Sequence, residues 1–192
     1  MYQPDTELSL HDLLCLKDFD VYYNMGQEET HLKSIVQWAE DNVVSGDSSP
    51  ALLILASLNL DAMPDKHEVN LYLQRYLCEQ NIRWPAIRVS TLVWLKYQLM
   101  HLLQCRSVDE IEATLYSFST ACFDQSPLFF TRTARRLSYL YYELFDDWGP
   151  DYSFAASSMT SDAIINFVST RILPYYQAVN KPQWLLWLAE TR

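Results

Sequence analysis

Apolar side chains recur along this chain with the spacing of an α-helix. Between residues 69 and 77 they fall at i, i+3, i+4, i+7 and i+8, and the same pattern returns over 137–145. Shorter stretches at 35–43 and 111–122 fit the same template. From Val89 to Leu103 the chain is apolar nearly all round, which predicts a helix packed on several sides. The pattern therefore favours a chain built of helices.

Helix start signals separate these periodic segments. Five prolines stand where a first helical turn accepts them, namely Pro50, Pro64, Pro85, Pro127 and Pro182. Ser107, with a glutamate three residues later, forms a capping box, and Thr160 offers another N-cap. The regular return of these signals predicts short connections and antiparallel neighbouring helices.

Nine helices are predicted, together with two longer gaps at 17–29 and 149–159. Val21-Tyr22-Tyr23 in the first gap is a candidate short strand. Pro174 should kink or break the eighth helix. The predicted helices are 8–16, 30–45, 50–60, 64–80, 85–105, 107–122, 127–148, 160–179 and 182–190.

Composition narrows the fold class. The chain has 192 residues, of which 49% are hydrophobic, so it has ample material for a core and does not have the composition of a disordered protein. Three glycines are too few for the tight turns of an all-β protein. We therefore predict an all-α fold: a single irregular multi-helix bundle or helical array of about eight to nine helices, forming one domain over 1–192.

Charge is concentrated at one end of the sequence. Residues 1–70 contain thirteen Asp/Glu and three Lys, whereas residues 71–192 contain eleven of each sign, so the net charge of −10 lies in the first third. Such a field repels nucleic acid and anionic membranes and steers basic partners, although solubility alone also explains it. Arg132, Arg135 and Arg136 form the one local basic cluster, which favours a solvated face or a partner for the acidic third.

Cysteine usage and the absence of sorting signals indicate a compartment. All four cysteines fall within hydrophobic runs and none forms a C-x-x-C pair, which predicts reduced and buried thiols. The N-terminus lacks the pattern of a signal peptide, and the most apolar stretch, 92–103, is too short to span a bilayer. We expect a cytoplasmic protein.

Catalytic and metal motifs are missing from the sequence. The four histidines form no pair at ligand spacing, and the chain contains no G-x-S-x-G, G-x-G-x-x-G or Walker sequence. Residues 146–151 are acidic but lack the ligand order of an EF-hand. The prediction is a non-enzymatic protein with no catalytic residue, metal or cofactor. An enzyme with a dispersed helical site near His67 or His101 stays open as an alternative.

Two segments mix aromatic residues with acids in regions predicted to be non-helical. Aromatic rings supply much of the binding energy at interfaces, while carboxylates steer and orient a basic partner. The alternative is that these rings cover the core from the loops. The predicted partner-binding residues are Asp18, Phe19, Asp20, Tyr22 and Tyr23 in the first segment and Asp146, Asp147, Trp148, Asp151 and Tyr152 in the second.

One stretch resembles a known class of proteins. The run from Pro50 to Leu60 (PALLILASLNL), followed by residues 65–69 (DKHEV) and Tyr72-Leu73, is similar to small acidic helical proteins of bacterial polymorphic-toxin loci. These proteins include immunity proteins that neutralise a cognate toxin. The resemblance covers about an eighth of the chain and implies a partner protein without fixing any site residue.

The expected function is therefore protein binding. The first hypothesis is an immunity protein that blocks a basic bacterial toxin, such as a nuclease, through acidic and aromatic contacts. The second is a cytosolic helical chaperone that holds a client protein or leader peptide in an apolar groove. The Glu-Pro-x-Asp-His-like motif that is usual in helical maturation chaperones is absent from this sequence.

Overall fold

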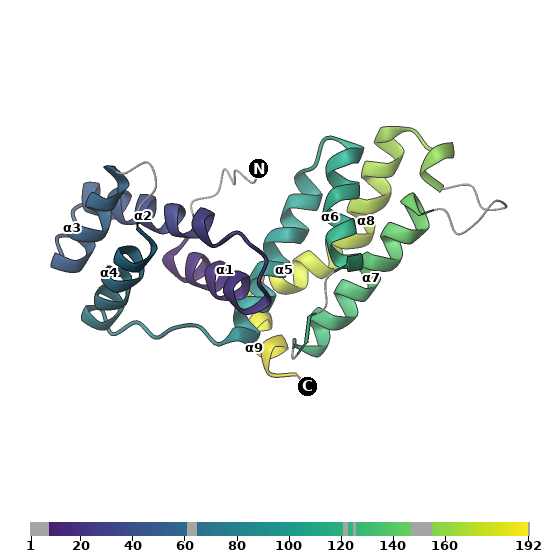
Figure 1. The fold of residues 1–192 in the computed structure, drawn as a ribbon. Coiled ribbons are helices and arrows are strands. Elements are labelled where there is room, and N and C mark those ends of the chain that lie inside the picture. The colour runs from purple at the N-terminus through teal and green to yellow at the C-terminus, as the bar shows by residue number, and fades with distance from the viewer. Residues whose placement is uncertain (1–7, 61–64, 121–122, 125, 147–154, 192) are drawn as a thin grey trace. The chain divides into compact units, whose positions relative to one another are not determined.

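The computed structural model describes residues 8–60, 65–120, 123–124, 126–146 and 155–191. Across these residues the chain forms nine α-helices and two short 3-10 helices, with no strand, so the predicted all-α class is confirmed. Figure 1 shows the helices in chain order. They are α1 (Leu10–Tyr23), α2 (Glu28–Val44), α3 (Pro50–Ser57), α4 (Lys66–Glu79), α5 (Ile87–Gln104), α6 (Val108–Thr120), α7 (Leu128–Phe145), α8 (Ser161–Val179) and α9 (Pro182–Glu190).

The contacts between residues divide the chain into two compact units. The N-terminal unit is Met1–Ser90 and the C-terminal unit is Thr91–Arg192. Helix α5 begins in the first unit and continues into the second without a break. The single domain over 1–192 stays a prediction.

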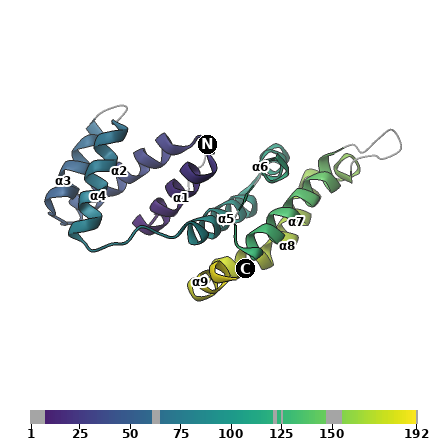
Figure 2. The same cartoon turned by 60° about the horizontal axis from the view of Figure 1, so that its bottom comes forward.

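The N-terminal unit is held together by apolar contacts between helices α1 to α4. Helix α2 packs against α1, α3 and α4, and α3 also packs against α4 (Figure 2). Leu32, Ile35, Val36 and Ala39 of α2 are buried, at the helical spacing that the sequence shows. Their partners in the same core include leucines of α1, α3 and α4. Burial of such side chains contributes roughly 1.5–3 kcal/mol each.

The C-terminal unit packs α7 against α6 and α9, and α8 against α6 and α9. An aromatic cluster lies in it, where the ring centroid of Trp94 is 5.4 Å from Phe118, 5.6 Å from Phe123 and 6.1 Å from Phe130. Aromatic pairs at these distances add about 0.5–1.5 kcal/mol beyond the burial of their area. In α5 the four consecutive residues 92–95 are buried, so this helix is covered on several sides, as its all-round apolar sequence predicts.

Several start signals of the sequence act as predicted. The hydroxyl of Ser107 accepts the amide N–H of Glu110 at 3.2 Å, and the hydroxyl of Thr160 accepts that of Ala163 at 3.3 Å. Pro50 and Pro182 occupy the first turn of α3 and α9. These caps place the helix starts within three residues of their predicted positions.

Pro174 was predicted to kink or break the eighth helix, and it does not break it. Helix α8 continues through it to Val179. Pro174 and Thr170, one turn earlier, are both exposed, so the carbonyl that loses its helical donor lies on a side of the helix that water can reach. The buried face of α8, including Ile172 and Val179, keeps its packing across the proline.

The predicted burial of every cysteine is also wrong. Cys15 and Cys105 are buried, but Cys78 is exposed near the end of α4. Cys78 follows the buried Leu77 and lies on the outer side of its helix, so a hydrophobic neighbour in sequence did not imply a shared face. Cys122 lies outside the described residues.

Candidate functional site

The first predicted binding segment is helical. Helix α1 runs to Tyr23, so the predicted gap at 17–29 is wrong up to that residue, and the candidate strand at 21–23 does not form. Ser9 caps the start, where its hydroxyl accepts the N–H of Asp12 at 3.1 Å. Leu13, Leu16 and Phe19 are buried at helical spacing, and this tertiary burial overrides the strand preference of the valine and tyrosines that follow.

Helix α1 ends with a tight turn. Asn24 adopts a left-handed conformation, with φ of 54°, and its amide N–H donates to the carbonyl of Asp20. Asparagine tolerates this region better than most residues because its short side chain can hydrogen-bond locally. Helix α2 starts four residues later, at Glu28. The corner between α1 and α2 is therefore short, and it brings the end of one helix beside the start of the next.

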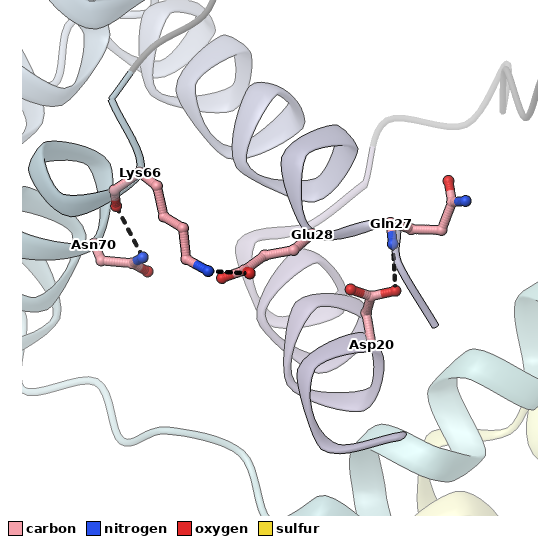
Figure 3. A network of polar contacts seen from close by, with 5 residues as sticks. All are labelled: Asp20, Gln27, Glu28, Lys66 and Asn70. Carbon is pink, nitrogen blue, oxygen red and sulfur yellow. Dashed lines mark hydrogen bonds and ion pairs between the residues drawn. The ribbon is translucent and has the colours of Figure 1, made fainter. Parts of the chain in front are cut away.

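Asp20 holds this corner closed. Its side chain is buried, and its Oδ1 accepts the amide N–H of Gln27 at 2.7 Å, as Figure 3 shows. Its carbonyl oxygen also accepts the N–H of Met25 at 3.0 Å. A carboxylate bonded to backbone N–H groups next to a helix start is favourably placed for the helix dipole. Asp20 was predicted to contact a partner, but these bonds occupy it inside the protein.

An ion pair ties the same corner to α4. The Nζ of Lys66, at the start of α4, contacts Oε2 of Glu28, at the start of α2 (Figure 3). The carbonyl of Lys66 accepts the side-chain amide of Asn70 at 2.9 Å. Since the lysine side chain is 56% exposed, the pair contributes at most about 1 kcal/mol. Its effect is to keep Glu28 turned toward α4.

Lys17 of α1 is a buried cation in the same unit as the turn between α1 and α2. Its Nζ lies 5.4 Å from the ring centroid of Trp84, in a cation–π arrangement. Burial lowers the pKa of Lys17, and the carboxylates of Glu28, Asp18 and Asp20 oppose that shift. The described residues place no carboxylate within ion-pair distance of Nζ, so the ring of Trp84 and the more distant carboxylates together compensate its charge.

Asp18 and His31 are two further polar residues that interact with the groups around Lys17 and Asp20. The indole N–H of Trp84 donates to Oδ1 of Asp18 at 3.1 Å. Burial lowers the pKa of His31; the negative charge of Asp20 raises it and the positive charge of Lys17 lowers it further. The imidazole therefore stays neutral to a lower pH than an ordinary histidine. Sequence reasoning missed Lys17 because residue 17 was expected to lie in a gap, although it stands three residues before Asp20 on the same helix. It missed His31 because only the tertiary fold brings α2 near Asp20.

The exposed members of the corner are few and close in sequence. Val21 is 54% exposed and Tyr22 47% exposed, whereas Phe19 is fully buried and Tyr23 is half-buried. Glu29, in the first turn of α2, is also exposed. Of the five residues predicted in this segment, Tyr22 alone has the exposure of a contact residue. We call Val21, Tyr22 and Glu29, together with the half-buried Glu28, the α1–α2 corner.

The second predicted segment is mostly beyond the described residues. Asp146 follows the last residue of α7 and is half-buried. Asp147, Trp148, Asp151 and Tyr152 lie outside the part of the chain that the structure describes. Their proposed role in binding stays a prediction.

Exposed aromatic residues that the sequence did not single out lie on α9. Trp184 is 53% exposed, Leu186 57% and Trp187 62%. Lys181 lies 5.7 Å from the ring of Trp184. The two tryptophans are three residues apart, a spacing that places them on neighbouring positions of one helix face. Leu185 and Leu188 of the same helix are buried, so both faces of α9 are apolar, which hides the exposed face from sequence reading.

The chain brings no metal-ligand cluster together in its described residues, since no group of three His, Cys, Asp or Glu side chains converges there. Among those same residues, no helix has the length and apolar character needed to cross a membrane. Comparison with known proteins gives no match to a protein-family model, to a curated protein or to a solved structure.

Proposed function

We propose that this chain is a non-enzymatic binding protein that neutralises a basic protein toxin, as immunity proteins do. The observation that carries the proposal is the α1–α2 corner, where Val21 and Tyr22 in the last turn of α1 and Glu29 in the first turn of α2 are exposed, and where Glu28 is half-buried. Tyrosine is enriched at interface hot spots, and surrounding carboxylates attract and orient a cationic surface.

The charge of the N-terminal unit supports this proposal. Residues 1–90 contain fourteen Asp/Glu and six Lys/Arg, for a net −8. A field of this sign accelerates encounter with a basic partner and weakens as salt screens it. The hydrogen bonds of Asp20 and the ion pair of Glu28 hold the corner in one conformation, so little ordering entropy would be lost on binding.

A substitution pair tests the corner directly. Tyr22→Ala combined with Glu29→Lys should weaken binding to the product of the adjacent gene by about tenfold or more, measured by calorimetry. The matched control is Tyr116→Ala with Glu79→Lys. Tyr116 is 52% exposed and rests on Tyr141 as Tyr22 rests on Tyr23, and Glu79 is also exposed. Equal loss in both variants, or no binding by the unaltered chain at micromolar concentration, would contradict the proposal.

The exposed face of α9 favours a second candidate, a helical chaperone for a client protein or leader peptide. Trp184, Leu186 and Trp187 offer apolar area that could hold an apolar segment. Salt separates the two candidates. Binding through carboxylates weakens as salt rises, whereas apolar binding does not. If the chain is a chaperone, substituting Trp184 and Trp187 by alanine should abolish binding of its client. If it is an immunity protein that acts through the α1–α2 corner, the same substitutions should leave binding of the toxin unchanged.

A further inference from the structure

Helix α7 has a basic outer face in a protein that is acidic overall. Leu128, Arg132, Arg135, Arg136 and Tyr139 are all exposed. Their spacing of three and four residues places them on one side of the helix. We call these five residues the arginine face. No Asp or Glu occurs between Leu128 and Tyr139, so this stretch carries three positive charges without a local counter-charge.

The three arginines have no carboxylate partner in the part of the chain that the structure describes. None of them forms an ion pair there, and the guanidinium of Arg135 lies 6.0 Å from the ring of Tyr139. Arg171 of α8 provides the contrast. It contacts Oε1 of Glu143 at 3.7 Å, and its guanidinium lies 3.6 Å from the ring centroid of Phe167. Both of these contacts lie within the same unit as the arginine face.

The opposite side of α7 fixes the arginine face in place. Phe130, Ala134, Leu137, Leu140 and Leu144 are buried, and the helix packs against α6 and α9. The exposed arginines are therefore attached to a backbone that packing holds rigid. A partner that binds them orders side chains only, which lowers the entropy cost of association.

We propose that the arginine face is a docking surface for a carboxylate-rich segment of a partner protein. The guanidinium group matches a carboxylate in a bidentate arrangement, and three of them in one and a half turns match a segment with repeated Asp or Glu. Leu128, 38% exposed, and Tyr139, 53% exposed, lie at the two ends. The segment that fits is acidic in its middle and apolar at each end, over about 16 Å of helix length.

Charge complementarity selects a protein segment over a nucleic acid. The C-terminal unit has ten Asp/Glu and eight Lys/Arg, a net −2, and the whole chain is −10. The start of α6, a helix packed on α7, carries Asp109, Glu110 and Glu112. A long polyanion extends beyond the three arginines into this net negative field and is repelled there, whereas a short acidic segment is no longer than the arginine face itself. This surface is opposite in sign to the α1–α2 corner and does not depend on its proposed role.

The test uses the full chain and a defined probe. The probe is a fluorescein-labelled peptide of about 12 residues, with glutamates in the middle, leucine at one end and phenylalanine at the other. Fluorescence anisotropy should show binding that the triple variant Arg132→Glu, Arg135→Glu, Arg136→Glu weakens by about tenfold or more. The charge-matched control reverses Lys33, Arg75 and Arg83, three exposed residues of the other unit. Both variants have a net charge of −16, and circular dichroism checks that each is folded.

Each outcome decides the proposal. Loss of peptide binding in the arginine-face variant with retention in the control supports it. A peptide in which glutamine replaces every glutamate should bind weakly or not at all. Equal weakening in both variants would reduce the effect to net charge and overturn the proposal. So would an absence of peptide binding at about 1 mM, or preferential binding of single-stranded poly-dT that depends on the same arginines.

Discussion

The two units of the chain use their charged residues in different ways. In the N-terminal unit, charged side chains near the α1–α2 corner are turned inward, where Asp20 bonds the backbone and Lys17 lies buried over Trp84. In the C-terminal unit, Arg132, Arg135 and Arg136 stand exposed on α7 without an ion pair among the described residues. The first unit is strongly acidic and the second is nearly neutral.

This difference teaches that a charge count does not locate a binding surface. The two carboxylates at residues 18–20 are occupied inside the protein, since Asp20 accepts the N–H of Gln27 next to α2 and Asp18 accepts the indole N–H of Trp84, so they offer a partner less than the sequence suggests. The nearly neutral unit carries three exposed arginines of one sign on one side of α7. The exposure and local grouping of charged side chains therefore locate a binding surface better than the net charge of a unit does.

The largest expected effects come from each unit's core. Leu52→Ala in the N-terminal unit should lower the free energy of unfolding by about 2–5 kcal/mol, and Phe130→Ala in the C-terminal unit by about 3–5 kcal/mol, because both side chains are fully buried. Since α5 crosses the boundary unbroken, each variant should shift one common transition in urea. Leu53→Ala, at a neighbour that is 44% exposed, is the matched control for the first. Two separate transitions would contradict the single-domain prediction.

A smaller effect on stability is expected from Asp20, whose hydrogen bond closes the turn between α1 and α2. Asp20→Ala should cost about 1–3 kcal/mol, because it leaves the amide N–H of Gln27 without its acceptor and removes a negative charge near Lys17. Asp20→Asn keeps an acceptor oxygen at the same place and should cost less. Thermal melts of both variants measure the difference. A loss as large in the asparagine variant would assign the effect to the charge rather than to the hydrogen bond.

The pH dependence of stability should report on His31, which lies near Asp20 and Lys17. Burial lowers the folded-state pKa of His31 below its ordinary 6.5, so the unfolded chain takes up this proton first as the pH falls. The contribution of His31 to stability is then complete above about pH 6.5 and declines as the pH falls toward the lowered pKa. Urea titrations at a series of pH values give the free energy of unfolding of the unaltered chain and of His31→Gln. Plotted against pH, the two free energies should have different slopes below about pH 6.5. Parallel slopes would show that the imidazole is not desolvated in the folded protein.

The smallest effect concerns thiol chemistry and leaves stability unchanged. Cys78 in the N-terminal unit is exposed, while burial raises the pKa of Cys105 in the C-terminal unit to about 11. Because the thiolate is the reactive form, a maleimide should label Cys78 under native conditions and spare Cys105. Mass spectrometry of the digested protein identifies the labelled site. Faster labelling of Cys105 would mean that α5 opens at its end.

The sequence predicted the helices well because hydrophobic period and capping act locally. The runs at Val69–Leu77 and Leu137–Phe145 lie in α4 and α7 as expected. The last turns of α1 were missed because the burial of Phe19, a tertiary effect, decides their conformation. The same limit applied to the site. Composition drew attention to Tyr22, whose role stays a prediction, whereas His31 of α2 comes near Asp20 of α1 only in the fold, and Lys17 shares a helix with Asp20 because α1 runs past its predicted end.

The salt dependence of partner binding tests the proposed function most directly. The affinity of the full chain for the product of the adjacent gene should be measured by calorimetry from about 50 mM to about 500 mM salt. If carboxylates at the α1–α2 corner steer a basic toxin, the Kd should rise by about tenfold or more over this range, and Tyr22→Ala with Glu29→Lys should weaken binding at every salt concentration. A Kd that does not change with salt, in a complex lost on substituting Trp184 and Trp187, would contradict the immunity proposal and favour a chaperone.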